Sequence, residues 1–201
     1  MTIRAVIWDL GGVILDVEDL APRRELARSL GTTCEDMEEL VLYGPSSVAA
    51  QRGEITVEKH WENILEALGL PASEMQTIRA GFWGRDRIEA DLVDFIRSLR
   101  PEYTTVLLSN AFANLRALLE ERWKIADLFD HLVISAEEGV AKPDPRIYRI
   151  ALDRAGVAPA EAVFTDDLIE NVEGARAVGM HALHYQNPEQ VMADLGPLLA
   201  A

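Results

Sequence analysis

The sequence predicts an α/β protein built on a doubly wound parallel sheet, with a small all-helical domain inserted into it. Two observations predict this fold. Short apolar runs alternate along the chain with amphipathic helical patterns, which is the order of parallel strands joined by crossover helices. One long block, residues 17–99, interrupts the alternation and shows helical patterns without a convincing strand.

Five apolar runs are the predicted strands. Most are continuous rather than alternating in character, which indicates strands buried on both faces, as in a parallel sheet. The runs are 5–8, 104–108, 132–134, 162–165 and 181–185, of which 132–134 is the weakest.

Helices are predicted between these strands. Residues 144–156 begin with Asp144 as a helix-capping residue and Pro145 at the first helical position, and Gly156 ends the pattern. Residues 171–180 end in a similar way at Gly179.

The inserted block contains three clear helical patterns, at residues 20–31, 56–69 and 88–100. An all-helical block placed after the first strand of an α/β core is typical of a lid over the site. We therefore predict a Rossmann-like core formed by residues 1–16 and 100–201, and a helical cap formed by residues 17–99.

Composition narrows the class of protein. The chain has 201 residues, of which 49% are hydrophobic and 26% charged, as in soluble globular proteins. The formal net charge is −15 and no cluster of Lys and Arg is present. This charge argues against nucleic acid and anionic membranes as partners. An anionic substrate would need a local positive site.

Cys34 is the only cysteine, which excludes an intramolecular disulfide and a thiolate zinc site. No apolar run is long enough for a membrane span, and the strand-like N-terminus lacks a signal-peptide cleavage pattern. We expect a cytoplasmic protein. The sequence leaves the number of subunits open.

Polar residues follow the predicted strands, where parallel α/β sheets bind their ligands. They are Asp9, Ser109 and Asn110, Lys142, and the pair Asp166 and Asp167. Together they suggest phosphoryl transfer through an aspartyl phosphate, because a carboxylate can attack phosphorus. The carboxylates of Asp9 and Asp167 suit Mg²⁺, and Lys142 and the Ser109 hydroxyl would hold the phosphate oxygens.

The segments WDLGGVILD, LLSN, AKPDPRIY and FTDDLIENVEGARAVGM resemble the four motifs of the haloacid dehalogenase-like hydrolases in order and spacing. The resemblance covers nearly the whole chain, and residues 17–99 resemble the helical cap of that family.

The resemblance implies a role for each matched residue. Asp9 matches the nucleophile, which also binds the metal, and Gly11 stands where a backbone carbonyl binds Mg²⁺. Ser109 matches the phosphate-binding hydroxyl, with the Asn110 amide nearby. Lys142 matches the lysine that pairs with the nucleophile and the phosphate.

The resemblance also implies a metal site in the fourth motif. Asp167 matches the metal ligand, and Asp166 would support the metal directly or through water. Which of the two is the direct ligand stays open at this point. Mg²⁺ is the expected cofactor.

One position departs from the pattern. Phosphatases of the family usually read Asp-x-Asp, and the second Asp is the general acid and base. Gly11 stands there, and the dehalogenases usually carry an aromatic residue, which is absent too. Asp16 is a weak candidate for a substitute acid.

The sequence thus predicts a Mg²⁺-dependent phosphatase of small phosphorylated metabolites. A haloacid dehalogenase or phosphosugar mutase of the same fold is an alternative. Another alternative is a catalytically impaired phosphate- or metal-binding regulatory protein, because of Gly11. In the cap, Arg52, Trp83 and Arg85 are candidate substrate contacts, although helix packing and a hinge role are the favoured explanation of these residues.

Overall fold

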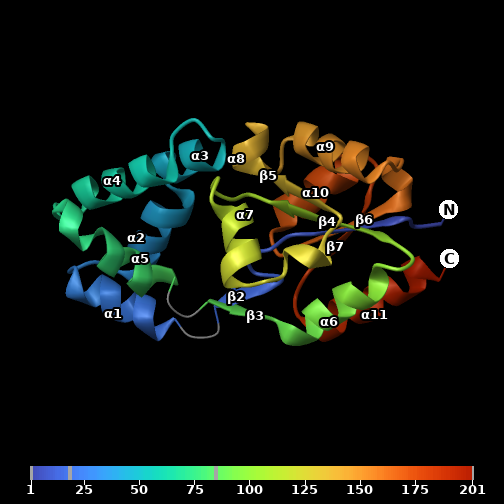
Figure 1. The fold of residues 1–201 in the computed structure, drawn as a ribbon, viewed down its shortest axis with the longest axis horizontal. Coiled ribbons are helices and arrows are strands. Elements are labelled where there is room, and N and C mark those ends of the chain that lie inside the picture. Colours follow the sequence, from blue (N-terminus) through green and yellow to red (C-terminus); the bar gives the residue numbers. More distant parts are fainter. Residues whose placement is uncertain (1, 18–19, 84–85, 201) are drawn as a thin grey trace.

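The computed structural model describes residues 2–17, 20–83 and 86–200. Five parallel strands form the central sheet in the order β5-β4-β1-β6-β7 (Figure 1). They are β1 (Ala5–Trp8), β4 (Thr104–Ser109), β5 (His131–Ile134), β6 (Ala162–Asp166) and β7 (His181–His184). Each coincides with a predicted strand to within a residue at either end, so the predicted fold class is confirmed.

Helices cover both faces of this sheet (Figure 1). In β1, Val6 and Trp8 pack into one apolar cluster and Ala5 and Ile7 into the other. The first cluster includes side chains of α6 (Ala90–Leu99) and α11 (Pro188–Leu199), and the second includes those of α9 (Pro145–Ala155) and α10 (Ile169–Ala177). Burial on both sides explains why the strand reads as a continuous apolar run.

The helix that follows Lys142 begins and ends as the sequence predicts. The Asp144 side chain accepts a hydrogen bond from the Arg146 backbone N–H, and Pro145 opens α9. Gly156 ends it with a φ of 65°, a left-handed conformation in which glycine is the least strained residue.

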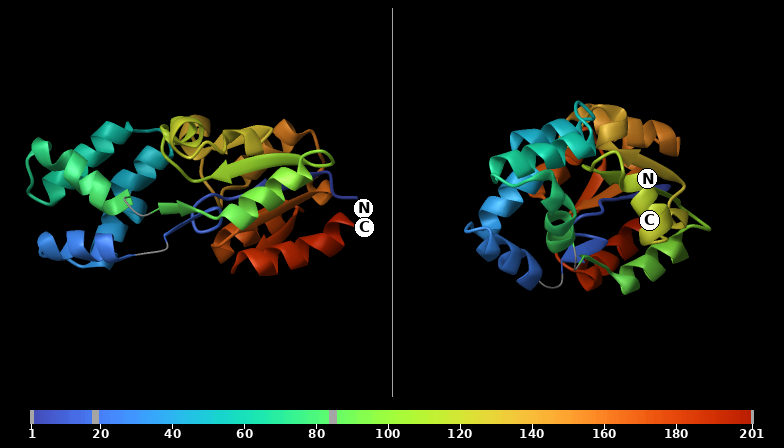
Figure 2. Two further views of the ribbon diagram at one scale, coloured as in Figure 1. Left: turned by 60° about the horizontal axis from the view of Figure 1, so that its bottom comes forward. Right: turned by 60° about the vertical axis from the view of Figure 1, so that its left-hand side comes forward.

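The cap has an apolar cluster of its own and lies beyond one end of the sheet (Figures 1 and 2). Its elements are α1 (Ala21–Ser29), α2 (Cys34–Glu38), the π-helical turn η1 (Glu39–Tyr43), α3 (Pro45–Gln51), α4 (Val57–Ala67), the 3₁₀ turn η2 (Ala72–Glu74) and α5 (Met75–Trp83). Its core side chains include Trp61, Ile64 and Phe82.

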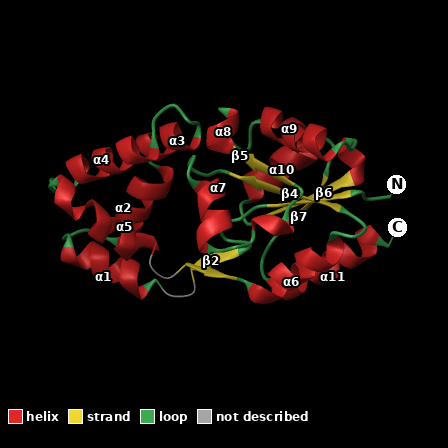
Figure 3. Ribbon diagram, in the orientation of Figure 1, coloured by secondary structure: helices red, strands yellow, loops and turns green. Residues whose placement is uncertain are grey.

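Besides the helical cap, the range 17–99 predicted for it contains a strand at the junction and a helix that packs on the core. Strand β2 (Leu15–Val17) pairs antiparallel with β3 (Asp86–Ile88) and forms a two-stranded ribbon at the junction (Figure 3). Helix α6 packs on the core through Leu92 and Ile96. The sequence could not assign α6 to a domain, because an amphipathic pattern shows that a helix has an apolar face but not which domain covers that face.

Short elements complete the core: α7 (Leu115–Ala117), the π-helical turn η3 (Leu118–Arg122), α8 (Ser135–Glu138), and the 3₁₀ turns η4 (Ala126–Leu128) and η5 (Pro159–Glu161). Within the described residues, no helix has the length and apolarity that crossing a membrane requires.

Candidate active site

The candidate site lies at the carboxyl ends of three adjacent strands. β1 lies between β4 and β6 in the sheet. Asp9 directly follows β1, Ser109 is the last residue of β4, and Asp166 is the last residue of β6. Parallel pairing therefore brings together residues that are far apart in the sequence, and the three side chains are nearly or fully buried.

Lys142 connects two of these strands through its ammonium group. Its Nζ lies 2.8 Å from Oδ1 of Asp9 and 2.6 Å from Oδ2 of Asp166. The Asn110 carboxamide holds the backbone of this lysine: its Oδ1 accepts from the Lys142 N–H at 2.8 Å and its Nδ2 donates to the Lys142 carbonyl oxygen at 2.9 Å. Asn110 is therefore a positioning residue for Lys142.

Asp166 has its two carboxylate oxygens occupied by the protein. Besides Lys142, Oδ1 accepts from the Leu168 backbone N–H at 2.8 Å and from Nδ2 of Asn171 at 3.0 Å. The Asp166 side chain is fully buried and does not line the cavity described below. Its contacts fit a residue that orients Lys142.

Asp167 has a different environment. It is half-buried and lines the cavity together with Asp9. One carboxylate oxygen from each of Asp9, Asp166 and Asp167 lies within 4.8 Å of the others. This donor set, with all ligands oxygen, fits a hard divalent cation such as Mg²⁺.

The charges of the cluster are unbalanced. Burial, together with the negative charge of Asp166, raises the pKa of Asp9 to about 7 against the opposing effect of Lys142. Burial and Asp166 also raise the pKa of Asp167. For Lys142, burial acts to lower the pKa, but Asp9 and Asp166 outweigh it and raise the pKa. One ammonium group faces three carboxylates, so a further cation would stabilise their ionised forms.

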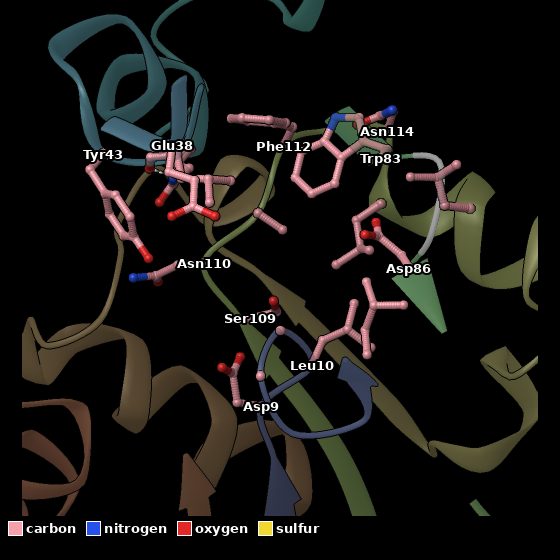
Figure 4. Close-up of a pocket in the computed structure, with 18 of the residues that line it drawn as sticks. Asp9, Leu10, Glu38, Tyr43, Trp83, Asp86, Ser109, Asn110, Phe112 and Asn114 are labelled. Carbon is pink, nitrogen blue, oxygen red and sulfur yellow. Dashed lines mark hydrogen bonds between the residues drawn. The ribbon is translucent and has the colours of Figure 1, made fainter. Parts of the chain in front are cut away.

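A cavity of about 960 Å³ lies between the core and the cap and opens on these groups. The predicted residues that line it are Asp9, Gly11, Ser109, Asn110, Lys142 and Asp167. Figure 4 shows Asp9 and Ser109 at the core end, with Glu38 and Tyr43 approaching from the cap.

The predicted substrate contacts of the cap differ in whether they line this cavity. Trp83 lines the cavity and Arg52 is not among the described residues that do so. Arg85 lies outside the described residues. Asp16 lies in β2, in the junction ribbon, and is likewise not among the described lining residues.

Sequence reasoning missed most of the lining that the cap and the loop after β4 supply, including Glu38, Tyr43 and Phe112. The sequence does give a signal for Asn171, since it follows the acidic pair by one helical turn, and its side chain binds Asp166. The apolar lining residues carry no such signal, because they look like ordinary core residues.

The two glycines after Asp9 differ, which gives a matched experiment. Gly12 has a φ of 73°, and a Cβ built on it would lie 2.3 Å from Oδ2 of Asp167. A Cβ on Gly11 would have nothing within 4 Å, and Gly11 is not among the positive-φ glycines.

We expect Gly12→Ala to lower the melting temperature, by a destabilisation of about 1–3 kcal/mol, because it combines backbone strain with displacement of the Asp167 carboxylate. Gly11→Ala is the control and should change stability by less than about 1 kcal/mol. Thermal melts of both variants measure this. Equal melting temperatures for the two variants would contradict the described loop geometry.

A family model for haloacid dehalogenase-like hydrolases matches residues 3–179. The chain belongs to this family. The predicted family is therefore confirmed, and this haloacid dehalogenase-like hydrolase carries the expected core.

Named relatives of this hydrolase include several phosphatases. Sesquiterpene phosphatase astK of Aspergillus oryzae is 30% identical over 98% of this chain and 97% of its own length. D-ribitol-5-phosphate phosphatase of Bacteroides thetaiotaomicron is 23% identical over 98% of each chain. Among solved structures, a family enzyme from B. thetaiotaomicron in complex with magnesium and inorganic phosphate has a TM-score of 0.78 and 25% identity, covering 94% of this chain and 98% of that one.

Proposed function

We propose that this hydrolase is a Mg²⁺-dependent phosphatase of small phosphorylated metabolites that acts through an aspartyl phosphate on Asp9. The observation that carries the proposal is the juxtaposition of Asp9, its Lys142 partner and the Asp167 carboxylate at the end of one cavity. The phosphatase names of the relatives support it, and a similar structure holds magnesium and phosphate.

The residues of the site have distinct roles in this reaction. An oxygen of Asp9 attacks phosphorus, the bond from phosphorus to the leaving-group oxygen breaks, and that oxygen takes up a proton. Water then attacks the acyl phosphate, which releases inorganic phosphate and restores the Asp9 carboxylate. Lys142 and the Ser109 hydroxyl are placed to bind the phosphate oxygens as charge spreads over them.

For the metal, we propose Asp9, Asp167 and the Gly11 carbonyl as the direct ligands. Asp166 would orient Lys142 instead of binding the metal directly, because its two oxygens already accept hydrogen bonds from Lys142, Leu168 and Asn171. When bound, Mg²⁺ would supply positive charge to the phosphate and to the surrounding carboxylates.

The alternatives are weaker on specific grounds. The named relatives of highest coverage are phosphatases, whereas a haloacid dehalogenase and a phosphosugar mutase depend on fold alone. A regulatory protein without turnover would be indicated by Mg²⁺ and phosphate binding with no phosphate release. A cytoplasmic location, inferred from cysteine usage, stays a prediction.

The test of the function is phosphate release from phosphorylated metabolites and an aryl phosphate, with and without Mg²⁺. We expect EDTA to abolish release and Mg²⁺ to restore it. Asp167→Ala should raise the Mg²⁺ concentration for half-maximal rate by about 10-fold or more, because it removes one of two proposed carboxylate ligands. Glu173→Ala, an exposed acid on α10, is the control. Superimposable metal titrations of Asp167→Ala and the parent protein would place the metal elsewhere.

A further inference from the structure

The cavity that contains Asp9 is much larger than a phosphoryl group requires. Its volume of about 960 Å³ is at the upper end of the range for pockets that enclose a whole drug-sized ligand, about 300–1,000 Å³. Asp9 and Ser109 lie at one end, and Phe112 and Trp83 lie at the opposite end (Figure 4). The second end is therefore available to the part of the substrate that leaves.

Large apolar side chains dominate the lining away from Asp9. Six of them are only half-buried and line this cavity. They are Leu15, Leu42, Trp83, Phe112, Leu118 and Trp123. They come from the junction ribbon, from the cap and from the segment after β4, so the core and the cap both contribute apolar surface to one chamber.

Exposed apolar surface is also concentrated here. Within the described part of the chain, four large hydrophobic side chains are exposed, and two of these, Tyr43 at 58% and Leu168 at 38%, line the cavity. Exposed apolar surface that gathers at a concave site is a common mark of ligand binding.

The main charged group of the chamber is satisfied by the protein. Arg23 Nε donates to the Phe82 carbonyl oxygen at 2.8 Å. Its two terminal nitrogens lie 3.3 Å and 3.4 Å from carboxylate oxygens of Glu38 and Asp86. A sugar or amino-acid leaving group would have to compete for donors and acceptors that are already paired.

Three other polar side chains of the lining, those of Gln51, Arg79 and Arg122, are also held by the protein or lie over aromatic rings. The Gln51 amide donates to a backbone carbonyl and a hydroxyl of the cap. The guanidinium of Arg79 lies over the Trp61 ring at 5.5 Å, and that of Arg122 over the Trp123 ring at 5.8 Å. Such stacking presents the aliphatic parts of arginine beside the indoles.

We infer that this chamber, defined by the six half-buried apolar residues with Tyr43 and Leu168, binds a bulky and largely apolar leaving group. The substrate is then a phosphate monoester of a hydrophobic alcohol or phenol rather than of a sugar or amino acid. This inference rests on the proposed phosphatase function and specifies the substrate class of the same site.

The experiment uses 4-alkylphenyl phosphates with tails of increasing length, because the basicity of the phenolate leaving group stays nearly constant along the series. We expect kcat/KM to rise by about fourfold for each buried methylene until the chamber is filled. Tails of equal length that carry hydroxyl groups are the polar comparison and should show no such rise.

A pair of variants tests whether the dependence of kcat/KM on tail length arises in this chamber. Ala80 is exposed on α5 and lines the cavity, whereas Thr77, exposed on the same helix, is not among the described lining residues. Ala80→Phe fills part of the chamber and should flatten the dependence of kcat/KM on tail length. Thr77→Phe adds the same ring elsewhere and should keep the dependence of the parent protein.

The possible outcomes distinguish a failure of the apolar substrate class from a failure of the proposed phosphatase function. Turnover of phenyl phosphate with no gain from longer tails, or with a preference for hydroxylated tails, would overturn the apolar substrate class and leave the phosphatase intact. A gain that persists unchanged in Ala80→Phe would also overturn the assignment to this chamber. No phosphate release from any aryl phosphate in the presence of Mg²⁺ would overturn the proposed function, and the inference with it.

Discussion

Asp9→Asn should lower turnover by at least about 10³-fold while the protein stays folded. The amide keeps the shape of the side chain but cannot act as the nucleophile, so the covalent step is lost. Asparagine also replaces a buried carboxylate whose pKa burial has raised to about 7. Because that carboxylate stands beside two others, its neutralisation should not destabilise the protein.

The measurement is the steady-state hydrolysis of an aryl phosphate together with a thermal melt. Asp144→Asn is the control, because Asp144 is an acid that caps α9 and asparagine is an equally good cap. It should change neither rate nor melting temperature appreciably. An Asp9→Asn enzyme within tenfold of the parent rate would remove Asp9 from the nucleophile role.

The sequence predicts the core of this fold well for a physical reason. Strands buried on both faces are short and continuously apolar, and a polar residue follows β1, β4 and β6 directly, as Asp9 follows β1. Their parallel order then predicts that the residues after β1, β4 and β6 meet at one edge. Asp9, Ser109 and Asp166 do so.

What the sequence could not show depends on partners that are distant in the chain. The apolar face of α6 could cover either domain, and only packing assigns Leu92 and Ile96 to the core. The two acids at the end of β6 are both aspartates, so the sequence does not distinguish their roles. Their hydrogen bonds separate them: Asp166 is turned to Lys142 and Asn171, while Asp167 faces the cavity.

The chamber could not be predicted either, because a half-buried Phe112 or Leu118 has the same residue type as a core residue. The difference lies in which surface stays uncovered after the cap and the core have packed. That surface becomes visible only when both domains are placed.

The other large effect concerns the missing acid at position 11. General acid catalysis of leaving-group departure is worth about 10²–10⁴ in rate, and it matters most for a basic alkoxide. The parent enzyme should therefore hydrolyse aryl and acyl phosphates much faster than alkyl phosphates of similar size. A nitrophenolate leaves without a proton, so its rate does not depend on such a group.

Gly11→Asp should narrow this gap by raising the alkyl rates, and the structure allows the substitution. A Cβ at Gly11 has nothing within 4 Å, Gly11 is not among the positive-φ glycines, and the residue lines the cavity beside Asp9. The Gly11→Asp protein is therefore expected to fold without backbone strain at this position, whereas any side chain at Gly12 would be strained. The measurement compares the rates on a matched pair of aryl and alkyl phosphates, with a melting curve for each protein.

A parent enzyme that cleaves an alkyl phosphate as fast as an aryl phosphate would contradict the prediction and indicate a substitute acid. Tyr43 would then be the first residue to replace, as Tyr43→Phe, because its hydroxyl points from the cap toward Asn110 (Figure 4).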